Sequence, residues 1–267
     1  LGRFDYIDCC GVLHHLADPA AGLKALGALL RPHGVIVAAV YGRHARLGVH
    51  LVQQTLRAVG ARQNAAGIAL ARAALEGLAP HHPVRGWLAA TAPIWGPDAH
   101  LVDAWLPARE ATYDTDGVLE LVARAGLTFQ GWFDNRHYHA DGLYAPGHPM
   151  HGALAALDPP AQWRAMAGLT TPTDHCFLVC RPDRPGAWAL DLGDAALDPL
   201  IPGPRFPPAP RHPPMPYDPR DPLQAEVYRR LDGQTPVAAL AQGLPADAVR
   251  GFIRHLWRRD AVYLRRA

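Results

Sequence analysis

The first forty residues contain two apolar runs, and between them leucines recur at regular spacing. Residues 4–10 (FDYIDCC) are a short apolar run that predicts a strand buried on both faces. Asp18 and Pro19 then supply the N-cap and the first position of a helix, in which leucines recur at helical spacing until residues 31–34 (RPHG) end it. Residues 35–40 (VIVAAV) predict a second buried strand. This order, with its short connections, indicates the βαβ unit of a parallel sheet.

The middle of the chain changes character. Residues 45–107 carry helical patterns with proline-containing breaks and no strand signal, which predicts a helical insertion or cap. A helix over residues 116–125, ended by Gly126, and a strand over residues 127–132 then continue the α/β order. After a loop-rich stretch, residues 176–180 predict a further strand.

Prolines mark a boundary near the C-terminus, because eleven of the 27 prolines fall within residues 199–222. This density predicts a semi-extended linker, with a polyproline ligand of the SH3 type as the alternative. The pattern after it indicates three helices and a strand at residues 262–264, an order that resembles a winged-helix module. The expected organisation is therefore a domain over residues 1–182, a Pro-rich linker over 183–222 and a winged-helix-like domain over 223–267.

Composition narrows the class of protein. The 267 residues are 49% hydrophobic and 19% charged with a net charge of +2, which excludes a disordered or fibrous chain and a strongly basic nucleic-acid binder. Arginine replaces lysine almost throughout, with Lys24 the one lysine, as in GC-rich bacterial genes. Four cysteines in apolar runs predict buried thiols in a reducing cytoplasm. No apolar run is long enough to predict a membrane span, and no signal-peptide pattern is present.

The most specific pattern is FDYIDCCGVLHHLADPAAGLKALGALLRPHGVIVAAVY at residues 4–41. It resembles the fourth strand, the following helix and the fifth strand of bacterial class I S-adenosylmethionine-dependent methyltransferases of the type 11/12 kind. His33 stands where that family has the first glycine of a Pro-Gly-Gly turn. The resemblance covers residues 1–182 and implies an α/β, Rossmann-like sheet, S-adenosyl-L-methionine as cofactor and methyl transfer as the reaction.

Two parts of the family pattern are missing. The family cradles its cofactor on a G-x-G-x-G loop after the first strand and holds the ribose with an acid after the second, yet no two glycines here are separated by a single residue. Nor do three strands fit before Leu1. We therefore expect the C-terminal part of a longer enzyme, a fragment inactive alone whose first strand edge lies exposed until the missing N-terminal segment covers it. A genuinely short form is the alternative.

The resemblance also implies site residues. Cys9, Cys10 and Gly11 end the fourth strand, where the family's backbone meets the cofactor, although plain strand packing would equally explain the cysteines. His14 and His15 would be catalytic as general bases, or structural. Tyr41 and Arg46, after the fifth strand, would bind the acceptor substrate, although structural or surface roles would equally explain them.

A histidine-rich run at residues 134–141 is a second candidate. His137 and His139 would share one face of a strand and, with a carboxylate, could bind a transition metal, but the spacing fits no specific site and we expect no metal. A loop in which His137, His139 or Tyr144 lines the acceptor pocket is the functional alternative, and a surface loop is the default.

The sequence does not identify the binding partners of the chain or the methyl acceptor. Residues 223–267 hold eight arginines against four acids, and Arg254, Arg258 and Arg259 lie where a winged helix would read DNA. Nucleic acid is thus possible but not favoured over protein binding or stabilisation, and no membrane contact is expected. The acceptor could be a small metabolite, a modified tRNA or a protein side chain. The rival function is a non-catalytic scaffold whose tail binds protein or DNA.

Overall fold

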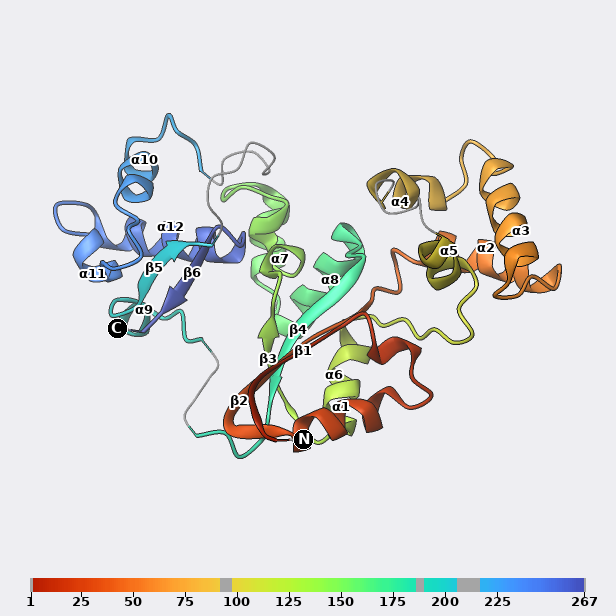
Figure 1. Cartoon of the computed structure of the whole chain (residues 1–267). Helices are drawn as coiled ribbons and strands as arrows, with labels where there is room; N and C mark the ends of the chain where they lie inside the picture. Colours follow the sequence, from red (N-terminus) through yellow and green to blue (C-terminus); the bar gives the residue numbers. More distant parts are fainter. Residues whose placement is uncertain (1, 92–97, 186–189, 206–216, 267) are drawn as a thin grey trace. The chain divides into compact units, whose positions relative to one another are not determined.

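The chain forms two compact units. The computed structural model describes residues 2–91, 98–185, 190–205 and 217–266. Unit 1 comprises Leu1–Phe133 and Ala167–Pro185, and unit 2 comprises Asp134–Met166 and Gly186–Ala267 (Figure 1). Unit 1 is therefore not the continuous domain over residues 1–182 that the sequence suggests, because its chain leaves after Phe133 and returns at Ala167.

A four-stranded sheet with the order β1-β2-β4-β3 is the frame of unit 1. Its strands are β1 (Phe4–Cys10), β2 (Leu30–Tyr41), β3 (Thr128–Trp132) and β4 (Asp174–Cys180). Strands β1 and β2 run parallel and are joined by helix α1 (Pro19–Ala28), so the predicted βαβ unit is confirmed. Strand β4 is antiparallel to both of its neighbours.

Helix α1 begins as predicted and ends earlier. The Asp18 carboxylate accepts hydrogen bonds from the backbone N–H groups of Ala20 and Ala21, at 3.0 and 3.1 Å, and so caps the helix. The segment expected to end the helix instead opens β2, with Leu30 fully buried at its first position. A side chain at Gly34 would come within 2.8 Å of the Phe4 carbonyl oxygen, so glycine permits the close approach of β1 and β2.

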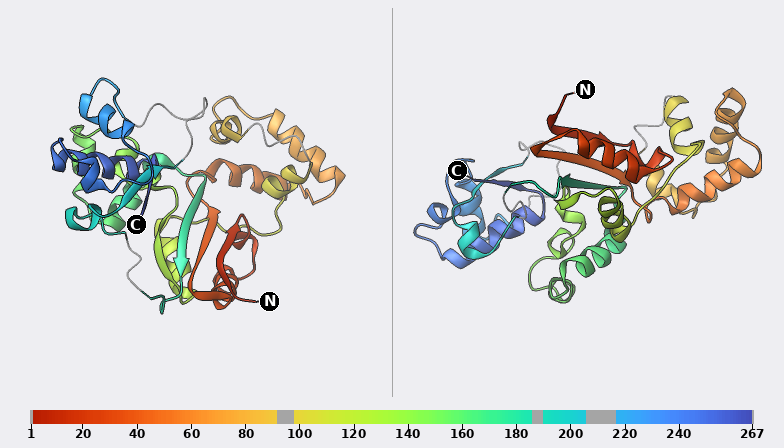
Figure 2. Two further views of the ribbon diagram at one scale, coloured as in Figure 1. Left: turned by 60° about the vertical axis from the view of Figure 1, so that its left-hand side comes forward. Right: turned by 90° about the horizontal axis from the view of Figure 1, so that it is seen from below.

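The predicted helical insertion follows β2. Its helices are α2 (Leu47–Ala58), α3 (Ala65–Glu76), α4 (Val84–Thr91) and α5 (Asp98–Trp105). They gather beyond the end of the sheet at which β2 finishes (Figures 1 and 2) and enclose their own apolar core around Trp105. Helix α6 (Thr115–Arg124) then returns to the sheet and leads into β3.

Strand β1 is an exposed edge, so the prediction that both of its faces are buried is wrong. Its one strand neighbour among the described residues is β2, and of its seven residues Cys9 alone is buried. Phe4 and Tyr6 are large exposed hydrophobic residues. The prediction of four buried thiols is also corrected: successive side chains of a strand alternate faces, and Cys10 is exposed.

Unit 2 combines short helices with a two-stranded sheet. Its elements are η3 (Asn135–His137), η4 (Ala140–Gly142), α7 (Pro149–Ala155), most of α8 (Pro159–Thr170), α9 (Asp194–Leu197), β5 (Ile201–Pro204), α10 (Pro222–Arg229), α11 (Val237–Leu240), α12 (Ala246–Arg258) and β6 (Val262–Arg265). The predicted order of three helices and a strand is found in α10, α11, α12 and β6. The assignment of these four elements as a winged helix stays a prediction.

The Pro-rich segment is more than the linker that its prolines predict. Strand β5 lies within it and pairs antiparallel with β6; Ile201 is buried, and Leu200 before it belongs to the apolar core of unit 2. Prolines are tolerated there because a two-stranded sheet consists of edge strands. Residues 206–216, the densest part of the predicted linker, lie outside the described residues.

One carboxylate joins the two stretches of chain that make unit 2. Asp260 accepts hydrogen bonds from the backbone N–H groups of Asn135 and Arg136, at 2.9 and 3.0 Å, and forms an ion pair with Arg205. It does so from a left-handed backbone conformation with φ of 61°. Burial raises the pKa of this carboxyl group.

We expect Asp260→Ala to lower the free energy of unfolding of unit 2 by about 3 kcal/mol, because it removes a buried ion pair with Arg205 and leaves two backbone donors without their acceptor. Asp260→Asn should cost less, because asparagine tolerates positive φ and keeps one accepting oxygen. Urea denaturation followed by circular dichroism measures both. The control is Asp247→Ala, which removes an exposed carboxylate from α12; equal losses for Asp260→Ala and this control would contradict the assignment.

Candidate functional site

The chain turns sharply where β1 ends. Gly11 has φ of +73°, and a Cβ atom built on it meets nothing within 4 Å, so open space lies beside the backbone at this point. The preceding side chain, Cys10, is exposed, and burial of its sulfur together with Asp8 raises the pKa of its thiol to about 11. The cysteine is thus a neutral thiol at physiological pH and no nucleophile.

Three aromatic rings and the guanidinium group of an arginine pack against one another beside this turn. The Arg46 guanidinium lies 3.9 Å from the centre of the Tyr41 ring, and that ring lies 3.8 Å from the His14 ring. The His15 ring follows at 4.3 Å from His14. We call these residues the Arg46–His15 column; it joins the end of β2 to the η1 turn (Leu13–His15) that follows β1.

His14 is the buried member of the column. Its side chain is 1% exposed, and neither ring nitrogen has a hydrogen-bond partner among the described residues. Burial, with smaller contributions from His15 and Arg46, lowers the pKa of the His14 imidazole to about 3. A group that stays neutral over the whole physiological range is no pH switch, and its two unmade hydrogen bonds fit a polar ligand placed beside it.

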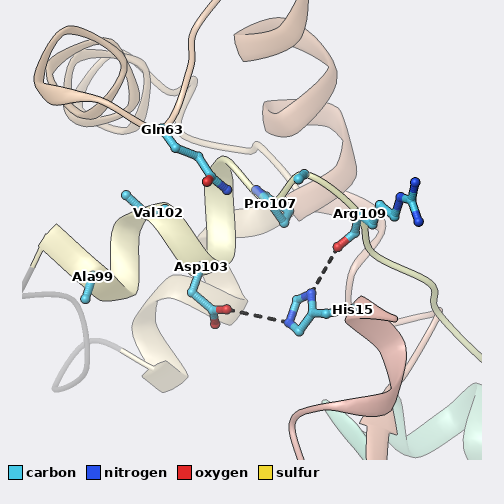
Figure 3. A pocket seen from close by; sticks show the side chains of 8 residues that line it. His15, Gln63, Ala99, Val102, Asp103, Pro107 and Arg109 are labelled. Atoms are coloured by element: carbon cyan, nitrogen blue, oxygen red, sulfur yellow. Dashed lines mark hydrogen bonds and ion pairs between the residues drawn. The ribbon is translucent and has the colours of Figure 1, made fainter. Parts of the chain in front are cut away.

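His15 lies at the wall of a cavity of about 540 Å³ (Figure 3). Its Nδ1 atom is 3.0 Å from the carbonyl oxygen of Arg109, and its Nε2 atom is 3.5 Å from Oδ1 of Asp103 on α5. The Tyr41 hydroxyl donates to the second oxygen of Asp103 at 3.4 Å, and burial raises the pKa of this phenol to about 12. Asp103 therefore ties the helical insertion to both strand ends.

Arg46 is held by a buried carboxylate. Glu110 and Arg46 are each 2% exposed, and the guanidinium donates to both oxygens of Glu110. His50 and Gln53 of α2 contact the same carboxylate at 3.1 and 3.2 Å. The next residue, Ala111, donates its N–H to the His14 carbonyl oxygen at 2.8 Å, so the segment that carries Glu110 is attached to the η1 turn.

A second cavity, of about 280 Å³, lies on the other side of Asp103. Tyr41, Arg46, Trp87 and Asp174 are among the residues that line it, and Asp103 lines both cavities. Two carboxylates, those of Asp103 and Asp174, line this cavity, whereas Asp103 is the one carboxylate among the described residues that line the first.

The structure divides the predicted site residues between the units. Cys9, Cys10, Gly11, His14, His15, Tyr41 and Arg46 belong to unit 1, whereas His137, His139 and Tyr144 belong to unit 2. His137 and His139 do not share a strand face, because the segment forms the η3 and η4 turns. His139 bonds to Gln162 at 3.1 Å, and burial lowers the pKa of its imidazole to about 4. Tyr144 stacks on His148.

The site also contains residues that were not predicted from the sequence, among them Asp103, Glu110 and Trp87. Each lies in or just after the helical insertion, where the periodicity gives helices but not their mutual packing. Within the described part of the chain, no three His, Cys, Asp or Glu side chains are grouped to hold a metal ion. In the same residues, no helix has the length and apolar character needed to cross a bilayer.

The end of β1 fits one side of a nucleoside cofactor and no more. Gly11 leaves the space, and His14 leaves unpaired nitrogens beside it. The glycine-rich loop and the acidic residue that would hold the rest are absent from the sequence. The residues present therefore make one wall of such a site.

Solved structures share the fold of this chain. PKMT2 from Rickettsia typhi in complex with AdoHcy aligns with 100% of the chain and 59% of its own length, at a TM-score of 0.61 and 13% identity. Another structure of PKMT2 from Rickettsia typhi aligns with 98% of the chain and 58% of its own length, at a TM-score of 0.59 and 12% identity. This likeness shows that the chain shares the α/β fold of these proteins.

Sequence comparison reaches a curated relative as well. The protein syc1184_c of Synechococcus sp. is 26% identical over 182 residues, which cover 65% of this chain and 43% of the relative. No family model matches the chain. The chain spans about half the length of the proteins that it resembles.

We expect Glu110→Gln to lower the free energy of unfolding by about 3–5 kcal/mol, because it leaves the Arg46 guanidinium buried without its counter-charge. The Arg46–Tyr41 contact should loosen with it. Thermal unfolding of the unchanged chain and of the Glu110→Gln variant measures this difference in free energy of unfolding. Asp5→Asn, which breaks an exposed pair with Arg31, is the matched control and should cost less than about 1 kcal/mol. A small effect of Glu110→Gln would show that the pair does not organise the column.

We expect His14 to make unit 1 acid-sensitive. The unfolded chain takes up a proton on this imidazole at its ordinary pKa of 6.5 and the folded chain only near pH 3, so stability falls as the pH drops through that interval. The full interval corresponds to about 5 kcal/mol. His14→Leu should flatten this part of the curve of unfolding free energy against pH. The exposed His33→Leu should not, and identical pH curves for the two variants would refute the burial of a neutral His14.

Proposed function

We propose that this chain is the C-terminal part of a bacterial class I methyltransferase of the type 11/12 kind, which transfers the methyl group of S-adenosyl-L-methionine to an acceptor. The observation that carries the proposal is the end of β1, where an open, positive-φ glycine lies next to a buried imidazole with unpaired nitrogens. Ligands of open α/β sheets bind at the carboxyl ends of parallel strands, and this is such an end. The shared fold with a protein solved with AdoHcy adds support.

The roles follow from position. Cys9, Cys10 and Gly11 would contact the cofactor through their backbone, with the glycine giving close approach. When bound, the cofactor supplies an activated methyl group, so the chain's own residues have only to align the acceptor and exclude water. His14, neutral and enclosed, would position the bound groups. His15, at the wall of the larger cavity, is the better placed of the two for proton transfer.

The other half of the cofactor site would come from a segment that precedes these residues in the complete protein. The free edge of β1 supports this, because Phe4 and Tyr6 are exposed along a parallel strand that another strand would cover. The length of the similar proteins supports it too. The 267 residues alone would then be inactive, and the complete enzyme would work in the cytoplasm.

Unit 2 would serve the parent protein and not a nucleic acid. Arg254 pairs with Asp194, Arg258 approaches Asp141 at 3.5 Å, and Arg259 donates to the Asp141 carbonyl oxygen at 3.2 Å. The arginines expected to read DNA are therefore engaged within unit 2. A winged-helix-like tail that stabilises the enzyme or binds protein is the role that these pairs favour.

Calorimetric titration with S-adenosylhomocysteine tests the proposal in two arms. One arm uses the 267 residues, and the other uses the chain extended through the in-frame codons upstream of Leu1. We expect binding in the extended protein and little or none in the shorter chain. An extended protein that folds cooperatively and does not bind would refute the methyltransferase function and favour the non-catalytic scaffold.

In the extended protein, Gly11→Leu should reduce the affinity for S-adenosylhomocysteine at least about tenfold, because the side chain fills the open space and is strained at positive φ. Gly126→Leu is the matched control. Gly126 also has positive φ, +69°, and open space at its Cβ position, but it lies at the end of α6. Equal effects of the two substitutions would mean that strain alone acts and that Gly11 does not face the cofactor.

A further inference from the structure

The larger cavity of unit 1 is lined by both apolar and polar residues. Its small apolar residues are Ala99 and Val102 of α5 and Pro107 and Ala108 after it. Its polar residues include Gln63 and a facing pair, Asp103 of α5 and His15 (Figure 3). At about 540 Å³ the space is that of a small organic molecule.

The facing pair of His15 and Asp103 lacks a hydrogen-bond donor between the two side chains. The carbonyl oxygen of Arg109 can only accept, so in the tautomer that satisfies this contact Nδ1 of His15 carries the ring proton and donates there. Nε2 then presents a lone pair, and the group 3.5 Å from it is the carboxylate of Asp103, also an acceptor. Nε2 is buried and has no hydrogen-bond partner among the described residues. Two acceptors that face each other leave a place for a donor.

The chemistry of the walls selects among donors. A carboxylate or phosphate would be repelled by Asp103. An ammonium group has three N–H bonds to satisfy; beyond His15 and Asp103, Gln63 is the one described lining side chain with an accepting oxygen, and Arg109 lines the same space. A hydroxyl group has a single proton to donate and no charge to desolvate.

We propose that this cavity binds the methyl acceptor, and that the acceptor is an uncharged molecule with a compact apolar body and a hydroxyl group, which donates its hydrogen bond to the His15–Asp103 pair. The assignment of the bound molecule as acceptor rests on the proposed methyl transfer. The binding site and its chemical preference rest on the cavity alone. Asp103 then positions the hydroxyl group through His15 as well as directly.

Three small probes of similar size test the preference on the 267-residue chain at pH 8. They are 4-methylphenol, 4-methylanisole, whose oxygen has no proton to donate, and benzylamine, which is a cation. Binding is followed by NMR through the methyl signals of Val102 and Ala99. We expect 4-methylphenol to bind about tenfold or more tightly than either other probe, the value of a hydrogen bond to a charged group. Equal binding of the first two probes, stronger binding of benzylamine, or no saturation by 4-methylphenol would overturn the proposal.

A matched pair of variants on α5 locates the donor's partner. Asp103→Asn puts an amide N–H beside Nε2 of His15. Because this N–H can donate to Nε2 in place of a bound hydroxyl group, the preference for 4-methylphenol over 4-methylanisole should disappear. Asp98→Asn is the same change on the same helix, at a residue that pairs with Arg72 and does not line the cavity, and it should keep the preference. Because the probes bind without cofactor, a failure here is distinct from a failure to bind S-adenosylhomocysteine, which would refute the proposed function instead.

Discussion

The buried pair of Arg46 and Glu110 is the interaction on which the candidate site depends. Arg46 is the residue that precedes α2, and Glu110 follows the last helix of the insertion, so the pair closes the helical insertion at its base. A buried guanidinium is tolerated only when its donors are satisfied. Arg46 also donates to the Ala104 carbonyl oxygen, and Gln53 and His50 contact the Glu110 carboxylate. The plane of Arg46 in turn holds the Tyr41 ring, and through it the two histidines.

This arrangement gives the neighbouring residues His14 and His15 different surroundings and different roles. His14 is enclosed by the column and stays neutral, so it contributes shape and two unpaired nitrogens. His15 turns outward to the cavity, where Arg109 and Asp103 set its orientation. Adjacent residues in a single 3-10 turn point to different surroundings, and the sequence pair His-His carries no hint of which imidazole is buried.

The local patterns predicted much of unit 1. The Asp18 cap, the parallel pair of strands and the helical insertion follow from spacing within about ten residues, and those elements are present. Burial was predicted less well, because it depends on neighbours that are distant in the chain: β1 has an apolar sequence but only one partner strand, so Tyr6 is exposed. For the same reason, Asp103 and Glu110 gave no signal. Their roles arise only when the insertion folds back on the strand ends, 62 and 64 residues from Tyr41 and Arg46.

The same reasoning explains why the site is incomplete although its column is well ordered. The column is held by contacts within residues 11–114, and these do not need the free edge of β1. Cofactor affinity, in contrast, requires groups on both sides of the β1 terminus, and only the side formed by Gly11 and His14 is present. An ordered acceptor cavity next to an incomplete cofactor site is the arrangement expected if Arg46 and Glu110 organise the first independently of the second. Under the proposed function, acceptor recognition and cofactor recognition would therefore be separable properties, and the first would depend on the Arg46–Glu110 pair.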